Sequence, residues 1–122
     1  MINQDLMQKA ESGDTDAMRS VAMEYMKRFD GENDNFVIAL DWMDRAAEHG
    51  NLEAMSDMAD VYRKHNKPEK AFEYEERAAK AGRAKSMYNL SIHYRDGLGV
   101  PVNKEKHMYW YNKGKENGFP PG

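Results

Sequence analysis

The sequence predicts an all-α fold: a right-handed α-solenoid of about three helix-turn-helix repeats, preceded by a leading half-repeat helix. One observation is a glycine that recurs after 37, 32 and 36 residues, at Gly13, Gly50, Gly82 and Gly118. Periods of roughly 20–50 residues are typical of solenoids, and helix-turn-helix repeats lie near ~34 residues. This glycine closes a recurring block, which reads Ala46-Ala47-Glu48-His49-Gly50, then Ala78-Ala79-Lys80-Ala81-Gly82, and in altered form Gly114-Lys115-Glu116-Asn117-Gly118.

Aromatic residues recur in the same frame. An aromatic residue always stands eight residues before the glycine of the block, and a tyrosine always stands eight residues after a small residue. Small residues let two helices approach closely, and aromatic side chains fill the space between helix pairs. These columns are Trp42, Tyr74 and Trp110; Tyr25, Tyr62 and Tyr94; and Ala17, Ala54 and Ser86.

The frame predicts seven helices in order. The leading helix is expected at about residues 2–12 and ends at Gly13, because the position after a helix often needs a left-handed backbone. The first repeat should follow as helices at about 14–29 and 35–49, with Asp14 as the N-cap. Helices this short are marginal alone, so stacking on neighbours must supply the stability.

The second repeat is expected as helices at about 51–65 and 67–81. Asn51 is a good N-cap, and Pro68 suits the first helical position. The third repeat should form helices at about 83–95 and 103–117. We therefore expect one α-solenoid domain over residues 1–122, with a capping helix at 1–12, repeats at about 13–49, 50–81 and 82–118, and a tail at 119–122.

These residues together resemble the Sel-one-like repeat family, whose members are relatives of the tetratricopeptide repeats. The resemblance covers about residues 10–118. Its clearest part is in the third repeat, with Leu90-Ser91-Ile92-His93-Tyr94, Gly97-Leu98-Gly99-Val100, Asn103 and Trp110.

The chain departs from the family pattern in the second and third repeats, which includes His107 at a position where the family favours alanine. The second repeat lacks Gly-x-Gly-Val and has the shorter link His65-Asn66-Lys67-Pro68. The third repeat has Gly114-Lys115 where the family has two alanines. Because a terminal repeat needs a polar outer face, we expect this helix face to meet solvent and Gly114 to tolerate alanine.

Composition excludes several functional classes. The formal charge is −3 and the sequence pI is about 5.8, which argues against general nucleic-acid binding. There is no cysteine, so thiol catalysis and disulfides are excluded. The start of the chain shows no signal peptide, and no apolar run approaches the ~20 residues that span a membrane. We therefore expect a cytoplasmic protein without membrane attachment.

The sequence offers little for catalysis. The four histidines show no metal-binding spacing, and Glu75-Glu76 is expected on a solvated helix face. Gly97-Leu98-Gly99 is expected to be a turn between helices rather than a phosphate loop. We therefore predict no catalytic residue, cofactor or metal ligand, although an enzyme could still arise if His93 and His107 approached each other near carboxylates.

The resemblance implies where a partner would bind. In tetratricopeptide-like stacks the first helix of each pair lines the concave face, and here its flanking positions combine basic residues with methionine, tyrosine and isoleucine. Exposed apolar groups rimmed by charge often mark an interface. The predicted partner-binding residues are Arg19, Met23, Met26, Lys27, Ser56, Asp60, Arg63, Lys64, Tyr88, Asn89, Ile92 and Arg95.

The leading functional hypothesis is a non-enzymatic adaptor or scaffold that holds a peptide or protein segment on this concave face. An acidic segment is one form of that partner, with Arg63 and Arg95 pairing its carboxylates. The chain itself is expected to be a monomer or weak dimer. Alternatives are an immunity or inhibitor protein that neutralises a toxin or enzyme by direct binding, a hydrolase-type enzyme, and an RNA binder.

Overall fold

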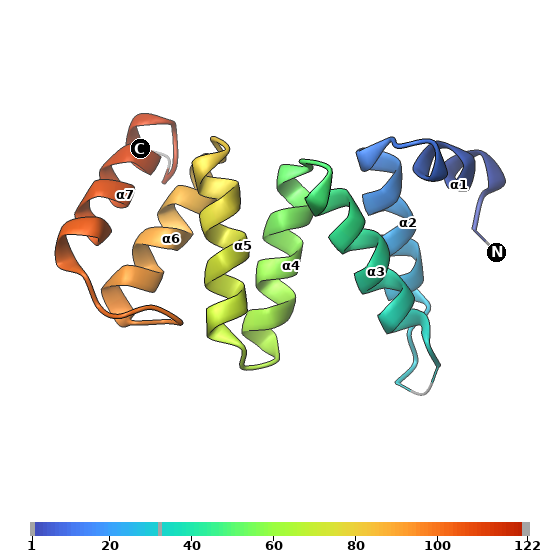
Figure 1. Ribbon diagram of the computed structural model, residues 1–122, viewed down its shortest axis with the longest axis horizontal. Helices are drawn as coiled ribbons and strands as arrows, with labels where there is room; N and C mark the ends of the chain where they lie inside the picture. The colour runs from blue at the N-terminus through green and yellow to red at the C-terminus, as the bar shows by residue number, and fades with distance from the viewer. Residues whose placement is uncertain (1, 32, 121–122) are drawn as a thin grey trace. The chain divides into compact units, whose positions relative to one another are not determined.

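The computed structural model describes residues 2–31 and 33–120, and these residues form seven α-helices and no strand (Figure 1). Every predicted helix is present, with its ends within about three residues of the expected ones. The all-α repeat fold is therefore confirmed. The helices are α1 (Gln4–Glu11), α2 (Thr15–Lys27), α3 (Asn35–Glu48), α4 (Leu52–Lys64), α5 (Pro68–Lys80), α6 (Ala84–Asp96) and α7 (Lys104–Glu116).

Side-chain caps begin several of these helices as predicted. An Asp14 carboxylate oxygen accepts a hydrogen bond from the Ala17 amide at 2.9 Å, and Asn51 does the same for Ala54 at 2.9 Å. Asn103 caps α7 through the Lys106 amide at 3.0 Å. Each cap satisfies one backbone donor that the first helical turn leaves without a partner.

The chain divides into two compact units, Met1–Met55 and Ser56–Gly122. In the first unit, α2 packs against both α1 and α3. Val21 of α2 and Met43 of α3 are buried in its core. Asn51 is buried too, and its side-chain amide donates to Asp16 Oδ1 at 2.8 Å, which ties the start of α4 to the start of α2.

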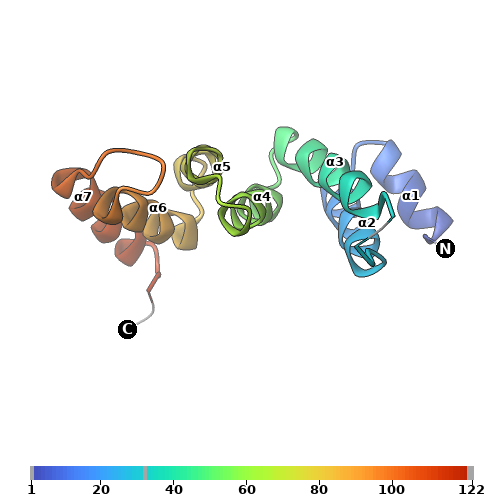
Figure 2. The same cartoon turned by 90° about the horizontal axis from the view of Figure 1, so that it is seen from below.

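In the second unit, α6 packs against α5 and α7. Its core contains Ala79, Met87, Leu90 and Tyr94, and the side chains of Phe72, Val100 and Trp110 pack around it. The end-on view in Figure 2 shows α5 offset to one side of its neighbours α4 and α6.

The prediction that Gly114 lies on a solvent-exposed face is wrong. Gly114 is buried in α7, and a Cβ atom added there would lie 3.0 Å from the Phe119 carbonyl oxygen and 3.3 Å from the Ala84 carbonyl oxygen. Phe119 folds back onto the end of α7, and its amide donates to the Gly114 carbonyl at 2.8 Å. Glycine replaces alanine here because the backbone of α6 and the tail leave little room for a side chain.

Candidate functional site

Two adjoining cavities lie in the second unit. The inner cavity has a volume of about 140 Å³, and the outer one has a volume of about 420 Å³. Both are lined by Arg63, Ala71, His93 and Leu98. We call their combined lining the α4–α6 groove; it consists of Ala59, Arg63, Asn66, Pro68, Ala71, Glu75, Asn89, Ile92, His93 and Leu98.

Helix α4 supplies a cation at the edge of the groove. The Arg63 side chain is exposed, and its guanidinium lies 3.1 Å from an Asp60 carboxylate oxygen one helical turn earlier. An exposed pair of this kind contributes little to stability, so a partner can replace Asp60 at small cost. Arg63 is therefore positioned by its neighbour and is still accessible.

Helix α5 supplies the floor, where the structure corrects the expectation for Glu75. This residue is only 2% exposed, whereas the sequence suggested a solvated helix face. Its Oε1 atom meets no hydrogen-bond partner within residues 2–31 and 33–120. Burial raises the pKa of Glu75, and side-chain hydrogen bonds with Ser86 and Asn89 lower that pKa in part. The groove therefore contains a buried carboxyl group with one oxygen still able to bind.

Helix α6 and the link that follows it close the groove. The His93 Nδ1 atom lies 2.7 Å from the Leu98 carbonyl oxygen. A carbonyl only accepts hydrogen bonds, so Nδ1 carries the proton and donates it. Burial lowers the pKa of His93, and the nearby positive charge of Arg63 lowers it further. The neutral ring therefore keeps Nε2 as an acceptor, and its hydrogen bond fixes Leu98 at the mouth of the groove.

Glycine allows this link to cross the start of α5. Gly99 has a φ of +74°, and a Cβ atom added to it would overlap the carbonyl group of Pro68. The preceding residue, Leu98, is 38% exposed and lines both cavities. The Gly-x-Gly sequence is thus a turn, as expected, and its close contact with α5 shapes the binding surface.

The predicted partner-binding residues fall into several environments. Arg63, Asn89 and Ile92 come together in the α4–α6 groove. Asp60 borders them through its ion pair with Arg63, and Lys64 is exposed at the end of α4. Ser56 differs, because it is only 7% exposed and is unavailable as a surface contact.

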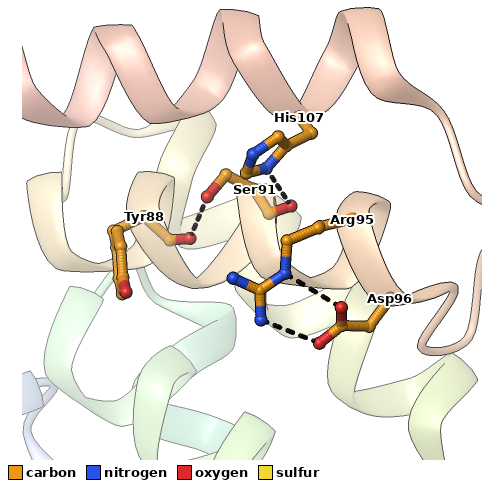
Figure 3. Close-up of polar contacts among 5 residues, drawn as sticks. All are labelled: Tyr88, Ser91, Arg95, Asp96 and His107. Atoms are coloured by element: carbon orange, nitrogen blue, oxygen red, sulfur yellow. Dashed lines mark hydrogen bonds and ion pairs between the residues drawn. The ribbon is translucent and has the colours of Figure 1, made fainter.

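Two other predicted residues on α6 are already engaged within the chain (Figure 3). The Arg95 guanidinium donates two hydrogen bonds to Asp96, at 2.9 and 3.0 Å. The Tyr88 ring packs edge-on against Phe119 of the tail, with ring centroids 5.4 Å apart, and it also contacts Tyr111. Tyr88 is therefore half-buried by its own chain.

The predicted residues of α2 lie in the first unit. Met23 and Lys27 are exposed, whereas Arg19 and Met26 are half-buried. Lys27 pairs with Glu24 at 3.5 Å on the helix surface. These residues are therefore accessible to different degrees.

Two histidines of the second unit, His93 and His107, bind backbone carbonyl groups. His93 binds the Leu98 carbonyl. His107 of α7 binds the Ser91 carbonyl through Nδ1 at 2.9 Å, as Figure 3 shows.

Across the described ranges, no three His, Cys, Asp or Glu residues are placed to hold a metal ion. No described helix is long and apolar enough to cross a membrane. The arrangement in the groove suits binding, since it offers an exposed cation, apolar side chains and buried polar groups.

Sequence reasoning missed Glu75, His93 and Leu98 as groove residues. A signal for Glu75 was present, because Ala71, Glu75, Ala78 and Ala79 follow the i, i+4, i+7, i+8 pattern of one helix face. A charged residue on an otherwise buried face is rare unless it is paired. Nothing in the local pattern pointed to Leu98, whose place depends on the path of the link.

Comparisons with known proteins agree with this architecture. The Sel1 repeat model matches residues 15–51, 53–82 and 84–119. Proteins of this kind generally act as non-enzymatic protein–protein interaction modules. A Sel1 repeat protein from Oxalobacter formigenes is similar in structure, with a TM-score of 0.85 and 30% identity over 96% of this chain and 90% of that one.

Two further relatives are longer than this chain. A protective antigen of uropathogenic Escherichia coli strains with an SLR fold has a TM-score of 0.77 and 26% identity; the match covers 93% of this chain and 25% of the antigen. Chitin synthase regulatory factor 3 of Schizosaccharomyces pombe is 26% identical over 120 residues, which span 90% of this chain and 13% of that protein. The chain thus spans about an eighth of the length of this curated relative.

Proposed function

The chain belongs to the Sel1 repeat family, and from this premise we propose that it is a non-enzymatic interaction module that binds a segment of a partner protein in the α4–α6 groove. The residues Arg19, Met23, Met26 and Lys27 of α2 are a separate proposed contact in the first unit. The regulatory role named for the fission yeast relative agrees with a protein that acts through a partner.

The observation that carries this proposal is the composition of the groove. Leu98 and Ile92 offer apolar surface, Arg63 offers an accessible cation, and the outer cavity of about 420 Å³ lies within the ~300–1,000 Å³ range of ligand pockets. Binding hot spots are enriched in arginine and lie in pockets that exclude water. This combination favours a peptide segment that inserts one or two side chains.

The kind of partner group that the site can bind depends on how Arg63 and Arg95 are already paired. Arg63 and Arg95 both have an intramolecular carboxylate, from Asp60 and Asp96. An acidic partner must therefore replace one carboxylate with another at Arg63. We propose that Arg63 contacts an acceptor group of the partner, either a carboxylate or a backbone carbonyl, and that Arg95 contributes less because Asp96 binds it with two hydrogen bonds.

Affinity capture with a groove variant tests the proposal. The double variant Arg63→Glu/Leu98→Asp changes two exposed groove residues and leaves the buried core intact. We expect wild type to capture a partner from a lysate of the native host and the variant to lose it. Circular dichroism should show both proteins to be equally helical.

The matched control is Val37→Asp/Lys115→Glu, which makes the same change in charge at exposed positions outside the groove. This control should capture the partner as wild type does. Isothermal titration with the purified partner should then give at least a tenfold loss of affinity for the groove variant alone. Equal binding by wild type and the groove variant would refute the proposed site.

A further inference from the structure

The inner cavity has a polar floor that the described part of the chain leaves incomplete. Glu75 is 2% exposed and lines the cavity, and its Oε1 atom has no hydrogen-bond partner among those residues. Buried polar atoms in folded proteins are nearly always hydrogen-bonded, so an exception needs an explanation. A buried polar atom of a residue that lines a cavity beside an open groove can obtain its partner from a ligand.

The neighbouring groups define the chemistry of that ligand. Among the residues that line the cavity, Glu75 and the neutral His93 ring carry acceptor atoms, and Asn89 and Arg63 carry donor groups. A ligand group that both donates and accepts hydrogen bonds can satisfy each side. A group that only donates or only accepts leaves one side without a partner.

Charge favours a neutral carboxamide over the two charged polar groups, the carboxylate and the ammonium. A carboxylate would meet the Glu75 carboxyl group at the floor of the cavity. An ammonium group would pass Arg63 at the entrance, and Arg63 already places a positive charge near His93. A neutral carboxamide avoids both conflicts and is the least costly of the three to remove from water.

We propose that the inner cavity is a recognition pocket for a side-chain carboxamide, glutamine or asparagine, of the bound partner segment. Its NH₂ group donates to Glu75 Oε1, and its carbonyl accepts from Asn89 or Arg63. The inference rests on the proposed function, since it names the side chain that the partner inserts into the groove.

Size agrees with this assignment. A cavity of about 150 Å³ holds a benzene molecule, which has six non-hydrogen atoms. The inner cavity of about 140 Å³ therefore has room for the five non-hydrogen atoms of a glutamine side chain. Burial raises the pKa of Glu75, and a carboxamide can pair with either protonation state because it both donates and accepts.

The test uses small probes and needs no partner protein. Wild-type chain labelled with ¹⁵N is titrated with the N-acetyl methylamides of glutamine, glutamate, lysine and leucine, which share one backbone and differ only in the side chain. We expect saturable shifts of the Glu75, Asn89 and His93 amides with glutamine, and at least fivefold weaker binding of the other three. Equal responses to all four probes, no response, or preference for lysine or glutamate would overturn the proposal.

A pair of variants on one helix checks the role of the carboxyl group. Glu75→Met keeps the volume and removes the acceptor, and Glu73→Met makes the same replacement at an exposed position of α5. We expect Glu75→Met to lose the preference for glutamine and Glu73→Met to retain it. Retained preference in a folded Glu75→Met protein would contradict the assignment.

The probe titration and the capture experiment fail independently. If capture depends on Arg63 and Leu98 but no probe is preferred, the groove binds a partner and only the carboxamide assignment is wrong. If the glutamine probe binds but capture is unaffected by the groove variant, the pocket is real and the proposed function of the groove is wrong.

Discussion

The two links between helices of the second unit differ in length and in the residues that they place in the groove. The α4–α5 link is short and turns through Asn66, which has a φ of +59°. The α6–α7 link is longer, with left-handed backbone at Gly97 and Gly99, and it crosses the start of α5. The short link reverses the chain and contributes Asn66 to the outer cavity, whereas the long link carries Leu98 into both cavities. A connection between two repeat helices can therefore be part of the binding surface.

The largest expected effect comes from Gly99→Ala. The added Cβ would overlap the Pro68 carbonyl, which is backbone and cannot move aside, and a left-handed residue adds its own penalty. These costs total roughly 2–5 kcal/mol, from ~1–2 for the conformation and ~1–3 for overpacking. Chemical denaturation measures the loss.

The control for this change is Gly97→Ala in the same link. Gly97 has nearly the same φ, +72°, but its added Cβ would meet only a methyl group of the exposed Val102 side chain at 3.0 Å. We expect this variant to lose only ~1–2 kcal/mol. Equal losses at the two glycines would show that contact with α5 does not matter.

The next effect is expected at Gly114, where α7 meets α6 and the tail. A leucine there should cost about 1–3 kcal/mol, because the carbonyls of Phe119 and Ala84 lie within 3.0–3.3 Å of the added Cβ. Lys115→Leu, at the exposed neighbouring position, should change the free energy of unfolding by less than ~0.5 kcal/mol. A tolerated Gly114→Leu would restore the original expectation of a solvent-facing helix.

A smaller effect is expected in the short link. Asn66→Ala should cost about 1 kcal/mol, because alanine tolerates a left-handed backbone less well than asparagine does. Asn66→Gly should be close to neutral or slightly stabilising. Thermal unfolding of the two variants separates these outcomes, and a loss as large as that of Gly99→Ala would mean that the short link also has a tightly packed contact.

The smallest effect concerns pH. Burial raises the pKa of Glu75 above its usual 4.5, partly offset by Ser86, Asn89 and Arg83 and reinforced by Asp60. Between 4.5 and the raised value the folded state binds more protons than the unfolded state, so the contribution of Glu75 to stability falls as pH rises through this window. Replacing the Glu75 carboxyl group should therefore remove this dependence of the free energy of unfolding on pH.

Urea unfolding of wild type and Glu75→Gln at several pH values measures the slope. The difference in free energy of unfolding, variant minus wild type, should increase in favour of the variant from pH 4 towards neutral pH. His93 acts in the opposite direction, because its lowered pKa makes stability rise with pH below 6.5. Since both proteins contain His93, its contribution cancels, and a flat difference would contradict the buried state of Glu75.

The helices were predictable because each depends on local spacing. The glycine period, the caps at Asp14, Asn51 and Asn103, and Pro68 at the first turn of α5 are readable from neighbouring residues alone. These signals need no knowledge of which elements meet in space. They were therefore sufficient for the number, order and approximate ends of the helices.

The groove was predictable only in part. Arg63, Asn89 and Ile92 follow from the position of the first helix in each repeat, and they do line the groove. Phe119 covers part of Tyr88 and approaches Gly114, and its position depends on where the chain turns after α7. A repeat pattern does not predict contacts of this kind between different segments of the chain.

The central claim is that a partner segment binds in the α4–α6 groove, and site-specific photocross-linking tests it most directly. A benzophenone amino acid is placed at Leu98, which is 38% exposed in the groove, or at Val37, which is 67% exposed on α3 outside it. Both proteins are irradiated in native host lysate, and the cross-linked products are compared. We expect one dominant partner adduct from position 98 and none of it from position 37. The same adduct from both positions, or from position 37 alone, would contradict binding in the groove.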